Sequence, residues 1–305
     1  MKRSFLVVAL SALVLSLAVP VRAGYFSGPD RSGAGARAVT LNASPPAVGI
    51  VVPPTPVPGN PITYWRDGAG NVVGISRKGQ LVWLEMPAGE VHVGPAAVAS
   101  GYGLDRDDGG IAENDYDIYD SASSPGAFQA VSIEKNLPGG STYPGKLITR
   151  QLVVTAVVRT PDGNTRLTNV WKWKPRSRAV SLTQTWRNTS SGISYLVFAP
   201  KLYIDVDNSG VLTNHFGRTS QTLFSWLDPD DSSPAYNVIL STQSSPFCIN
   251  AATPAFLDFG GCDGTHLAGG TPTYAGDAAF AVNLGIDRIF APGMKQVEKF
   301  QILVK

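Results

Sequence analysis

The chain has 305 residues, among them 32 glycines and 23 prolines, and only 16% of its residues are charged. This composition excludes a fold built on long amphipathic helices and favours many short strands joined by turns. The formal net charge is +2, and without the first 23 residues the chain carries 22 Lys and Arg against 23 Asp and Glu. Such a near-neutral chain lacks the basic surplus expected of a nucleic-acid-binding protein.

Residues 1–23 are typical of a signal peptide. Two basic residues precede an apolar run from Phe5 to Val19, and small residues at positions 21 and 23 suit a cleavage site. A membrane anchor is the alternative, but the run is shorter than the roughly 20 residues that a spanning helix needs. We therefore predict an exported protein, either secreted or held in the periplasm or at the cell surface, with no transmembrane segment after removal of the signal.

Residues 24–60 are rich in Gly and Pro, with six prolines between Pro45 and Pro58. Because proline has no N–H for a strand ladder, we predict an extended arm or linker here. It is either a plain spacer or a ligand for a groove that recognises polyproline helices.

Residues 61–305 alternate strand-like runs with turn signals at roughly the 8–12-residue spacing of sandwiches and barrels. The predicted fold class is all-β, a large antiparallel β-sandwich with very little helix. It is either a supersandwich or two fused β-domains, with a subdivision near residue 127.

The segment 105–120 holds seven carboxylates in sixteen residues and is predicted to be an acidic loop or sheet edge. Asp105, Asp107 and Asp108 are followed by two glycines, and these oxygen ligands suit Ca²⁺. The spacing does not fit an EF-hand, so the alternatives are a calcium loop of another kind and a solvated acidic loop.

The segment 147–210 is predicted to form the centre of the sandwich, with a tight hairpin turn at 161–164. After that turn, Trp171 and Trp173 alternate with Lys172 and Lys174 and therefore share one face of a strand. The two tryptophans either fill the core or stack on the sugar rings of a ligand.

The central segment ends in Asp205-Val-Asp207-Asn-Ser209-Gly210, which matches the first half of a calcium loop. Phe216 occupies the position where an EF-hand needs Glu, which excludes an EF-hand. The remaining alternatives are a Ca²⁺-binding turn with Asp205, Asp207 and Ser209 as ligands and a plain hairpin turn.

Asp205 and Asp207 are also the candidates for a glycosidase pair, because such enzymes use two carboxylates. His215 is the best single candidate for a general acid or base. The chain has no Gly-x-Ser-x-Gly elbow, phosphate loop or dinucleotide fingerprint.

Cys248 and Cys262 are the two cysteines of the chain. In an exported protein they are predicted to form a disulfide, with two free thiols as the alternative.

The favoured function is a binding or structural role without a cofactor, or with Ca²⁺ as a stabilising ion, and a glycan or another surface protein as partner. The alternative is a carbohydrate-active enzyme that uses Asp205 and Asp207.

Overall fold

The computed structural model describes a set of segments that together cover most of the chain after residue 55. These are residues 53, 56–94, 98–110, 112–120, 127–206, 215–220, 223–227, 237–243, 248–252, 278–283 and 289–305. All described residues belong to one compact unit, residues 48–305. The predicted signal peptide and most of the predicted arm therefore lie outside the described residues.

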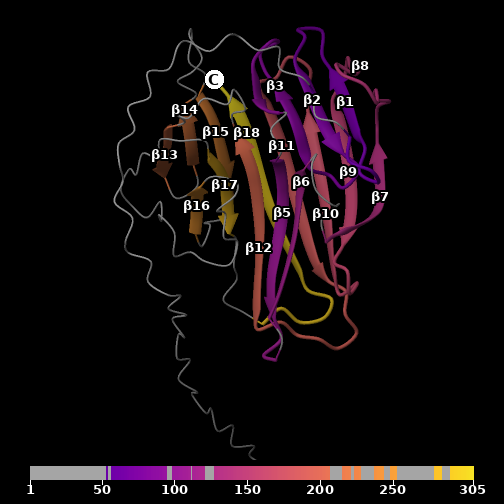
Figure 1. The fold of residues 1–305 in the computed structure, drawn as a ribbon, viewed down its shortest axis with the longest axis vertical. Coiled ribbons are helices and arrows are strands. Elements are labelled where there is room, and N and C mark those ends of the chain that lie inside the picture. Colours follow the sequence, from indigo (N-terminus) through magenta and orange to yellow (C-terminus); the bar gives the residue numbers. More distant parts are fainter. Residues whose placement is uncertain are drawn as a thin grey trace, which may run out of the picture. The chain divides into compact units, whose positions relative to one another are not determined.

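The described residues form three β-sheets (Figure 1). One five-stranded sheet has the order β4 (Val91–Val93), β3 (Leu81–Glu85), β2 (Val72–Ser76), β1 (Ile62–Arg66), β8 (Lys146–Leu147). The eight-stranded sheet has the order β13 (His215–Ser220), β14 (Leu223–Leu227), β15 (Asn237–Thr242), β18 (Lys295–Val304), β11 (Ala179–Asn188), β10 (Thr165–Trp173), β9 (Leu152–Arg159), β7 (Gln129–Lys135). The other five-stranded sheet has the order β16 (Cys248–Ala252), β17 (Ala278–Asn283), β12 (Val197–Val206), β5 (Val98–Asp107), β6 (Ala112–Asp120).

The predicted all-β, antiparallel fold is confirmed. Every strand pair in the described segments is antiparallel except β1 with β8. No helix among the described residues is long and apolar enough to cross a membrane.

The β9–β10 hairpin follows from its sequence. Its turn is closed by the Gly163 N–H, which donates to the Thr160 carbonyl oxygen at 2.9 Å, and Gly163 has a φ of 76°. Glycine adopts this left-handed conformation without steric cost. From the turn onward, β10 alternates buried and exposed or half-buried residues, so one face of the strand enters the core.

Trp171 and Trp173 lie in that core with 3% and 1% of their surface exposed. Their indole N–H groups donate to the carbonyl oxygens of Gly79 at 2.8 Å and Ser177 at 3.1 Å. Both rings therefore take the predicted core role. Neither presents a ring face to solvent on which a sugar can stack, because the other sheets cover this face of β10.

The core contains two apolar clusters, one around Trp171 and Trp173 and the other around Trp186. On the inner face of the eight-stranded sheet, Asn169 and its register partner Gln184 lie between them. The Gln184 amide donates to Asn169 Oδ1 at 3.1 Å. This hydrogen bond compensates part of the lost hydration of the pair, while Gln184 Oε1 is buried without a hydrogen-bond partner among the described residues.

The structure refines two sequence expectations. Of the two alternatives for the acidic segment 105–120, the structure has the sheet edge and not the loop, since β5 and β6 form a hairpin across it and β6 lies at the edge of its sheet. The predicted arm also enters the sandwich before residue 61. Val57 and Asn60 are buried, the Val57 N–H donates to Tyr119 Oη at 3.1 Å, and Asn60 Nδ2 donates to Gln80 Oε1 at 2.8 Å.

Candidate functional site

A row of four basic residues crosses the outer face of the eight-stranded sheet. Arg166 of β10 is the register partner of both Arg159 in β9 and Arg187 in β11. Arg187 in turn pairs with Lys295 of β18. Residues paired in this way share one face, with Cβ atoms about 5 Å apart, so the row extends about 14 Å across four strands. We call these four residues the cation row.

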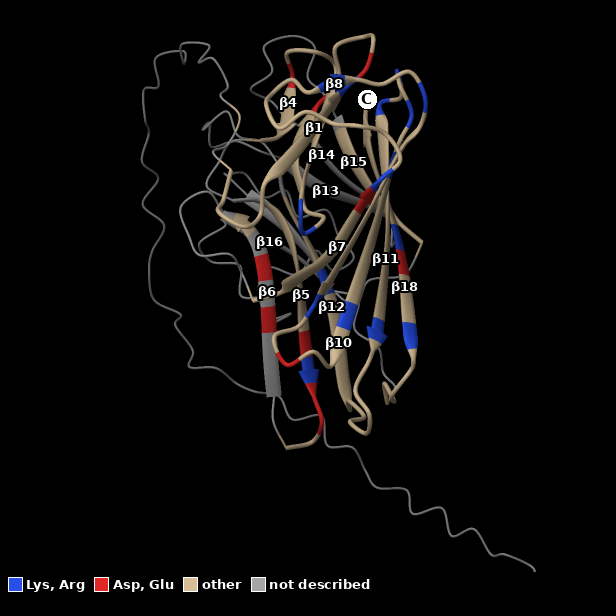
Figure 2. Cartoon of the chain, turned by 90° about the vertical axis from the view of Figure 1, so that its right-hand side faces the viewer, with Lys and Arg blue, Asp and Glu red and all other residues tan. Residues whose placement is uncertain are grey.

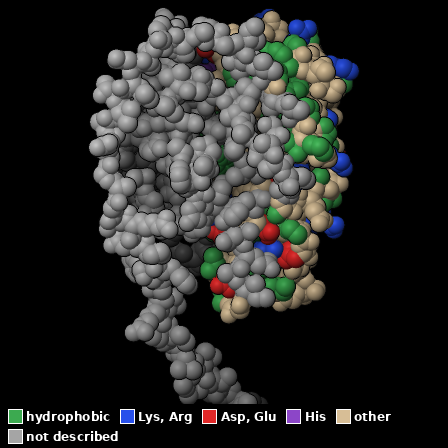
Figure 3. Space-filling model, in the orientation of Figure 1, with side chains coloured by type: hydrophobic (Ala, Val, Ile, Leu, Met, Phe, Trp, Pro, Cys, Tyr) green, Lys and Arg blue, Asp and Glu red, His purple; other side chains and the backbone are tan. Residues whose placement is uncertain are grey.

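The cation row is exposed to solvent. All four side chains are exposed, and the neighbouring Val297 has 50% of its surface exposed. Basic segments lie side by side on β10, β11 and β18 in Figure 2, and Lys and Arg side chains follow one margin of the described surface in Figure 3.

Acidic partners for the cation row are scarce. Within β7, β9, β10, β11 and β18, the outer face carries a single carboxylate, Glu134. Glu134 pairs in register with Thr155, four residues along β9 from Arg159. The four basic residues form no ion pair with any described carboxylate. Like charges directly opposite one another destabilise a sheet, so this arrangement is unfavourable at low ionic strength, and a bound anion would relieve the repulsion.

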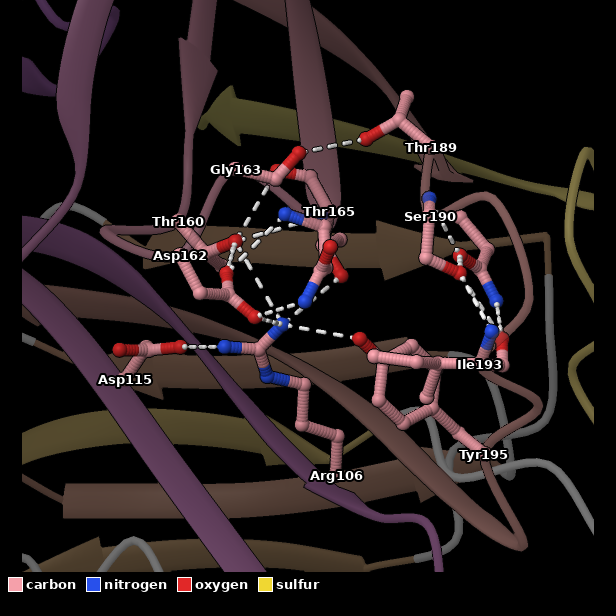
Figure 4. A network of polar contacts seen from close by, with 12 residues as sticks. Arg106, Asp115, Thr160, Asp162, Gly163, Thr165, Thr189, Ser190, Ile193 and Tyr195 are labelled. Atoms are coloured by element: carbon pink, nitrogen blue, oxygen red, sulfur yellow. Dashed lines mark hydrogen bonds and ion pairs between the residues drawn. The ribbon is translucent and has the colours of Figure 1, made fainter.

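A buried ion-pair network fixes the hairpin that carries Arg159 and Arg166 (Figure 4). Arg106 of β5 has 3% of its surface exposed. Its Nη1 lies 2.9 Å from Asp162 Oδ2, in the β9–β10 turn, and its Nη2 lies 2.9 Å from Asp115 Oδ2 in β6. Asp162, the carboxylate closest in sequence to Arg159 and Arg166, is therefore already engaged with a buried guanidinium.

Hydroxyl groups complete the network. Arg106 Nη1 also donates to Tyr195 Oη at 3.1 Å, and the Thr160 hydroxyl donates to Asp162 Oδ1 at 2.5 Å. The Thr165 N–H donates to Thr160 Oγ1 at 3.1 Å. Thr160 and Thr165 directly adjoin Arg159 and Arg166, so the network fixes the backbone at both arginines.

The network also sets the charge of its members. Burial acts to raise the pKa of the Asp162 carboxyl, but hydrogen bonds from Thr160 and Arg106 outweigh burial and hold its pKa below the usual range. Burial acts to lower the pKa of the Arg106 guanidinium, but its hydrogen bond and ion pair with Asp162 raise that pKa overall. Both groups therefore remain charged at neutral pH.

The other half of the cation row is fixed by hydrogen bonds to backbone carbonyl oxygens. The Thr189 hydroxyl donates to the Gly163 carbonyl oxygen at 2.9 Å, which joins the end of β11 to the hairpin turn. Asn188 Nδ2 donates to the Phe290 carbonyl oxygen at 2.9 Å, and the Gly293 N–H donates to the Asn188 carbonyl oxygen at 2.9 Å. These bonds hold the segment that leads into β18 and Lys295.

Beyond the cation row, the outer face is hydroxyl-rich and not aromatic. The next paired positions are Thr168, Thr185 and Val297, and then Val170, Thr183 and Lys299. The outer positions of β7, β9, β10, β11 and β18 hold no aromatic residue. On these five strands, the outer face therefore offers cations and hydroxyl groups but no aromatic platform for stacking.

The acidic residues predicted as calcium ligands have other contacts in the structure. Asp105 forms an ion pair with the buried Lys201 of β12. The carboxylates of Asp107 and Asp108 accept hydrogen bonds from the N–H groups of Gly109 at 2.6 Å and Gly110 at 3.0 Å. No group of three or more His, Cys, Asp or Glu residues suited to a metal occurs in the described part of the chain.

The second predicted calcium site lies elsewhere. Asp205 is in β12, six residues beyond Ala199, which is the register partner of Asp105. Six strand residues extend about 20 Å, so Asp105 and Asp205 cannot share one ion. Asp207 and Ser209 lie outside the described residues, and for His215 the structure describes only its place as the first residue of β13.

The predicted disulfide cannot be compared with the structure. Cys248 begins β16, and Cys262 lies outside the described residues. The pairing of these two cysteines stays a prediction.

The cation row itself was not predicted from the sequence. Its members stand in four segments between residues 159 and 295, and each alone is an ordinary exposed basic residue. Part of the row could have been predicted from the turn at 161–164, because a hairpin centred on this turn places Arg159 opposite Arg166. Placing Lys295 beside Arg187 requires the tertiary pairing of β11 with β18.

Comparison with family models and with curated protein sequences gave no match. Similar solved structures include a bacterial glucoamylase complexed with acarbose, at 9% identity and a TM-score of 0.49 over 82% of this chain. The chain spans about a third, 34%, of that protein. A proposed aldose 1-epimerase from Escherichia coli has 12% identity and a TM-score of 0.42, with 81% of this chain and 99% of that chain covered. A Synechocystis protein has 8% identity and a TM-score of 0.44, with 83% and 97% covered. Similarity at this level assigns neither an activity nor a ligand to the chain.

Proposed function

We propose that the chain is an exported carbohydrate-binding protein that holds an acidic polysaccharide on the outer face of its eight-stranded sheet. The observation that supports this proposal is the cation row: four exposed basic residues, directly opposite one another, without an acidic partner among the described residues. Guanidinium groups pair well with carboxylate and sulfate groups, and an anionic polymer would relieve the repulsion between the four cations.

The rest of the face favours a sugar polymer over a nucleic acid. Single-stranded nucleic acids bind to basic grooves in which aromatic side chains stack on successive bases. The outer positions of the five strands around the cation row hold no aromatic residue but many hydroxyl groups, which suit the hydroxyl groups of a polysaccharide. The near-neutral charge of residues 24–305 agrees with this preference.

The test compares two double variants of the mature chain. Arg166→Gln with Arg187→Gln removes the centre of the cation row, and the control Lys172→Gln with Lys299→Gln removes the same charge elsewhere on the same face. Binding of alginate and dextran sulfate is measured by calorimetry at low and physiological salt, with neutral dextran and single-stranded DNA as comparisons. We expect the row variant to bind an acidic polysaccharide at least about tenfold more weakly, a loss of about 1.4 kcal/mol.

We expect the control variant to bind within about threefold of the parent protein, because screening limits the contribution of distant charges. Equal binding of neutral dextran, or tighter binding of DNA than of both acidic polysaccharides, would contradict the proposal. So would a row variant that binds like its control.

Calcium stabilisation remains part of the proposal, through Asp105, Asp107 and Asp108 or through Asp205, Asp207 and Ser209. We expect millimolar Ca²⁺ to raise the melting temperature above its value in excess EDTA. Identical melting temperatures in the two solutions would exclude both sites.

The carbohydrate-active enzyme is retained as the alternative, with Asp205, Asp207 and His215 as its candidates. It predicts that the mature chain shortens one of the same polysaccharides and that Asp207→Asn abolishes this activity without loss of stability. Reducing-end assays on alginate and dextran sulfate test it directly.

A further inference from the structure

A surface pocket of about 590 Å³ lies at the end of the molecule opposite the cation row. Its walls come from the β1–β2 turn, from β8 and the residues after it, and from the β10–β11 turn. Leu147, Ile148 and Pro175 form its apolar part, and Lys174 and Arg176 supply positive charge. This volume is within the usual range for small-molecule sites, which combine apolar walls with a few polar groups.

Arg176 has an unusual backbone conformation in this pocket. It is the one non-glycine residue with positive φ in the described part of the chain, at 65°. It stands third in the turn Lys174-Pro175-Arg176-Ser177, which is closed by the Ser177 N–H donating to the Lys174 carbonyl oxygen at 3.0 Å. A proline at the second position of the turn and a positive φ at the third define a type II turn. The third position of such a turn strongly favours glycine. A bulky residue there is strained, and such strain tends to persist where a side chain has a function.

The buried carboxylate of Asp67 maintains this strained conformation. The Arg176 N–H donates to Asp67 Oδ2 at 2.5 Å, and Asn71 Nδ2 donates to the same oxygen at 3.0 Å. The N–H groups of Ala69 and Asn71 donate to Asp67 Oδ1 at 2.9 and 3.0 Å. Both oxygens of Asp67 are therefore used by these donors.

The side chains of Lys174 and Arg176 are exposed, and neither forms an ion pair with a described carboxylate. Two cations thus stand beside the apolar wall, in which Leu147 has 54% of its surface exposed. A ligand that complements this pocket carries a carboxylate at one end and an apolar body at the other.

We propose that this pocket binds a small organic carboxylate. The carboxylate accepts paired hydrogen bonds from the Arg176 guanidinium and lies near the Lys174 ammonium, while the body of the ligand packs on Leu147, Ile148 and Pro175. A role of the guanidinium in the pocket would account for arginine at a turn position that glycine fills without strain. The proposal is independent of the polysaccharide, because β10 separates Lys174 from Arg166 by eight residues, about 26 Å.

The decisive variant is Arg176→Gly, which removes the guanidinium and relieves the strained turn. Binding of benzoate, glucuronate and inorganic sulfate to the mature chain is measured by calorimetry, and thermal unfolding is followed for each variant. We expect Arg176→Gly to weaken carboxylate binding at least tenfold while its melting temperature stays the same or rises by about 2 °C. Arg178→Gln, which removes a nearby exposed cation outside the pocket, should bind within about twofold of the parent.

The three probes distinguish the chemical classes of ligand that could supply the carboxylate. Preference for benzoate indicates an apolar acid, and preference for glucuronate indicates an acidic sugar; either result supports the pocket. The proposal is overturned if none of the probes binds at millimolar concentration, if sulfate binds as tightly as the carboxylates, or if Arg176→Gly binds them unchanged. A fall of several degrees in the melting temperature of Arg176→Gly also overturns it, because arginine would then stabilise the turn.

Discussion

Arg106 and Arg166 lie near each other at one end of the sandwich, on opposite sides of the β9–β10 hairpin, and their surroundings contrast. Arg106 is buried between the sheets and pairs with two carboxylates, Asp115 and Asp162. Arg166 is exposed and has a basic residue opposite it on each side. A buried charge must be paired to compensate its lost hydration, whereas an exposed one is hydrated by water. Pairing inside is therefore required for stability, whereas the exposed charges need no partner within the fold and can meet an external anion, as proposed above.

The strongest test of this contrast is removal of the buried cation. Arg106→Met leaves two carboxylates partly buried without their partner, and we expect a loss of about 3 kcal/mol in the free energy of unfolding. Urea denaturation measures it, with Arg66→Met, an exposed arginine without an ion pair to a described residue, as the matched control. A loss below about 1 kcal/mol would show that the network contributes little.

A second test uses acid. The Asp162 pKa is held below its ordinary value of 3.8, so its stabilising contribution is complete above that value and is lost as pH falls through the lower folded-state pKa. We expect Asp162→Asn to flatten the decline in unfolding free energy as pH falls below about 3.8. The arginines of the cation row keep their charge throughout this window and do not contribute to the slope. If the free energy of unfolding depends on pH in the same way in the parent and in Asp162→Asn, the stabilising role of the ionised Asp162 is contradicted.

The smallest expected effect belongs to the exposed cation. Arg166→Gln removes a charge that faces Arg159 and Arg187, so we expect unfolding free energy to rise by about 0.5 kcal/mol at low salt. The gain should shrink at about 1 M salt, where screening suppresses the repulsion between the remaining exposed charges. A destabilised variant would mean that Arg166 makes a favourable contact in the folded protein, and the contrast with Arg106 would fail.

Much of the fold was predictable from local sequence. The turn at 161–164 and the alternation through Trp171 and Trp173 placed a hairpin with its tryptophans in the core, because strand side chains alternate between faces. The acidic segment 105–120 was harder to predict, because carboxylates are rare in strands, and the sequence left a loop and a sheet edge as alternatives. In the structure it forms strands, since Arg106 and Lys78 pair with Asp115 and Asp117 of β6 between the sheets.

Sequence by itself determined the all-β class, the hairpin turns and the inward faces of the central strands, because these depend on patterns a few residues long. Tertiary structure alone decided the pairing of β11 with β18 and the ion pairs of Arg106, which join residues far apart in the chain. For the same reason, it alone decided which charges were left unpaired. Four ordinary basic residues became a cation row only when four strands aligned in register, and Arg176 was recognisable as strained only from its backbone angle.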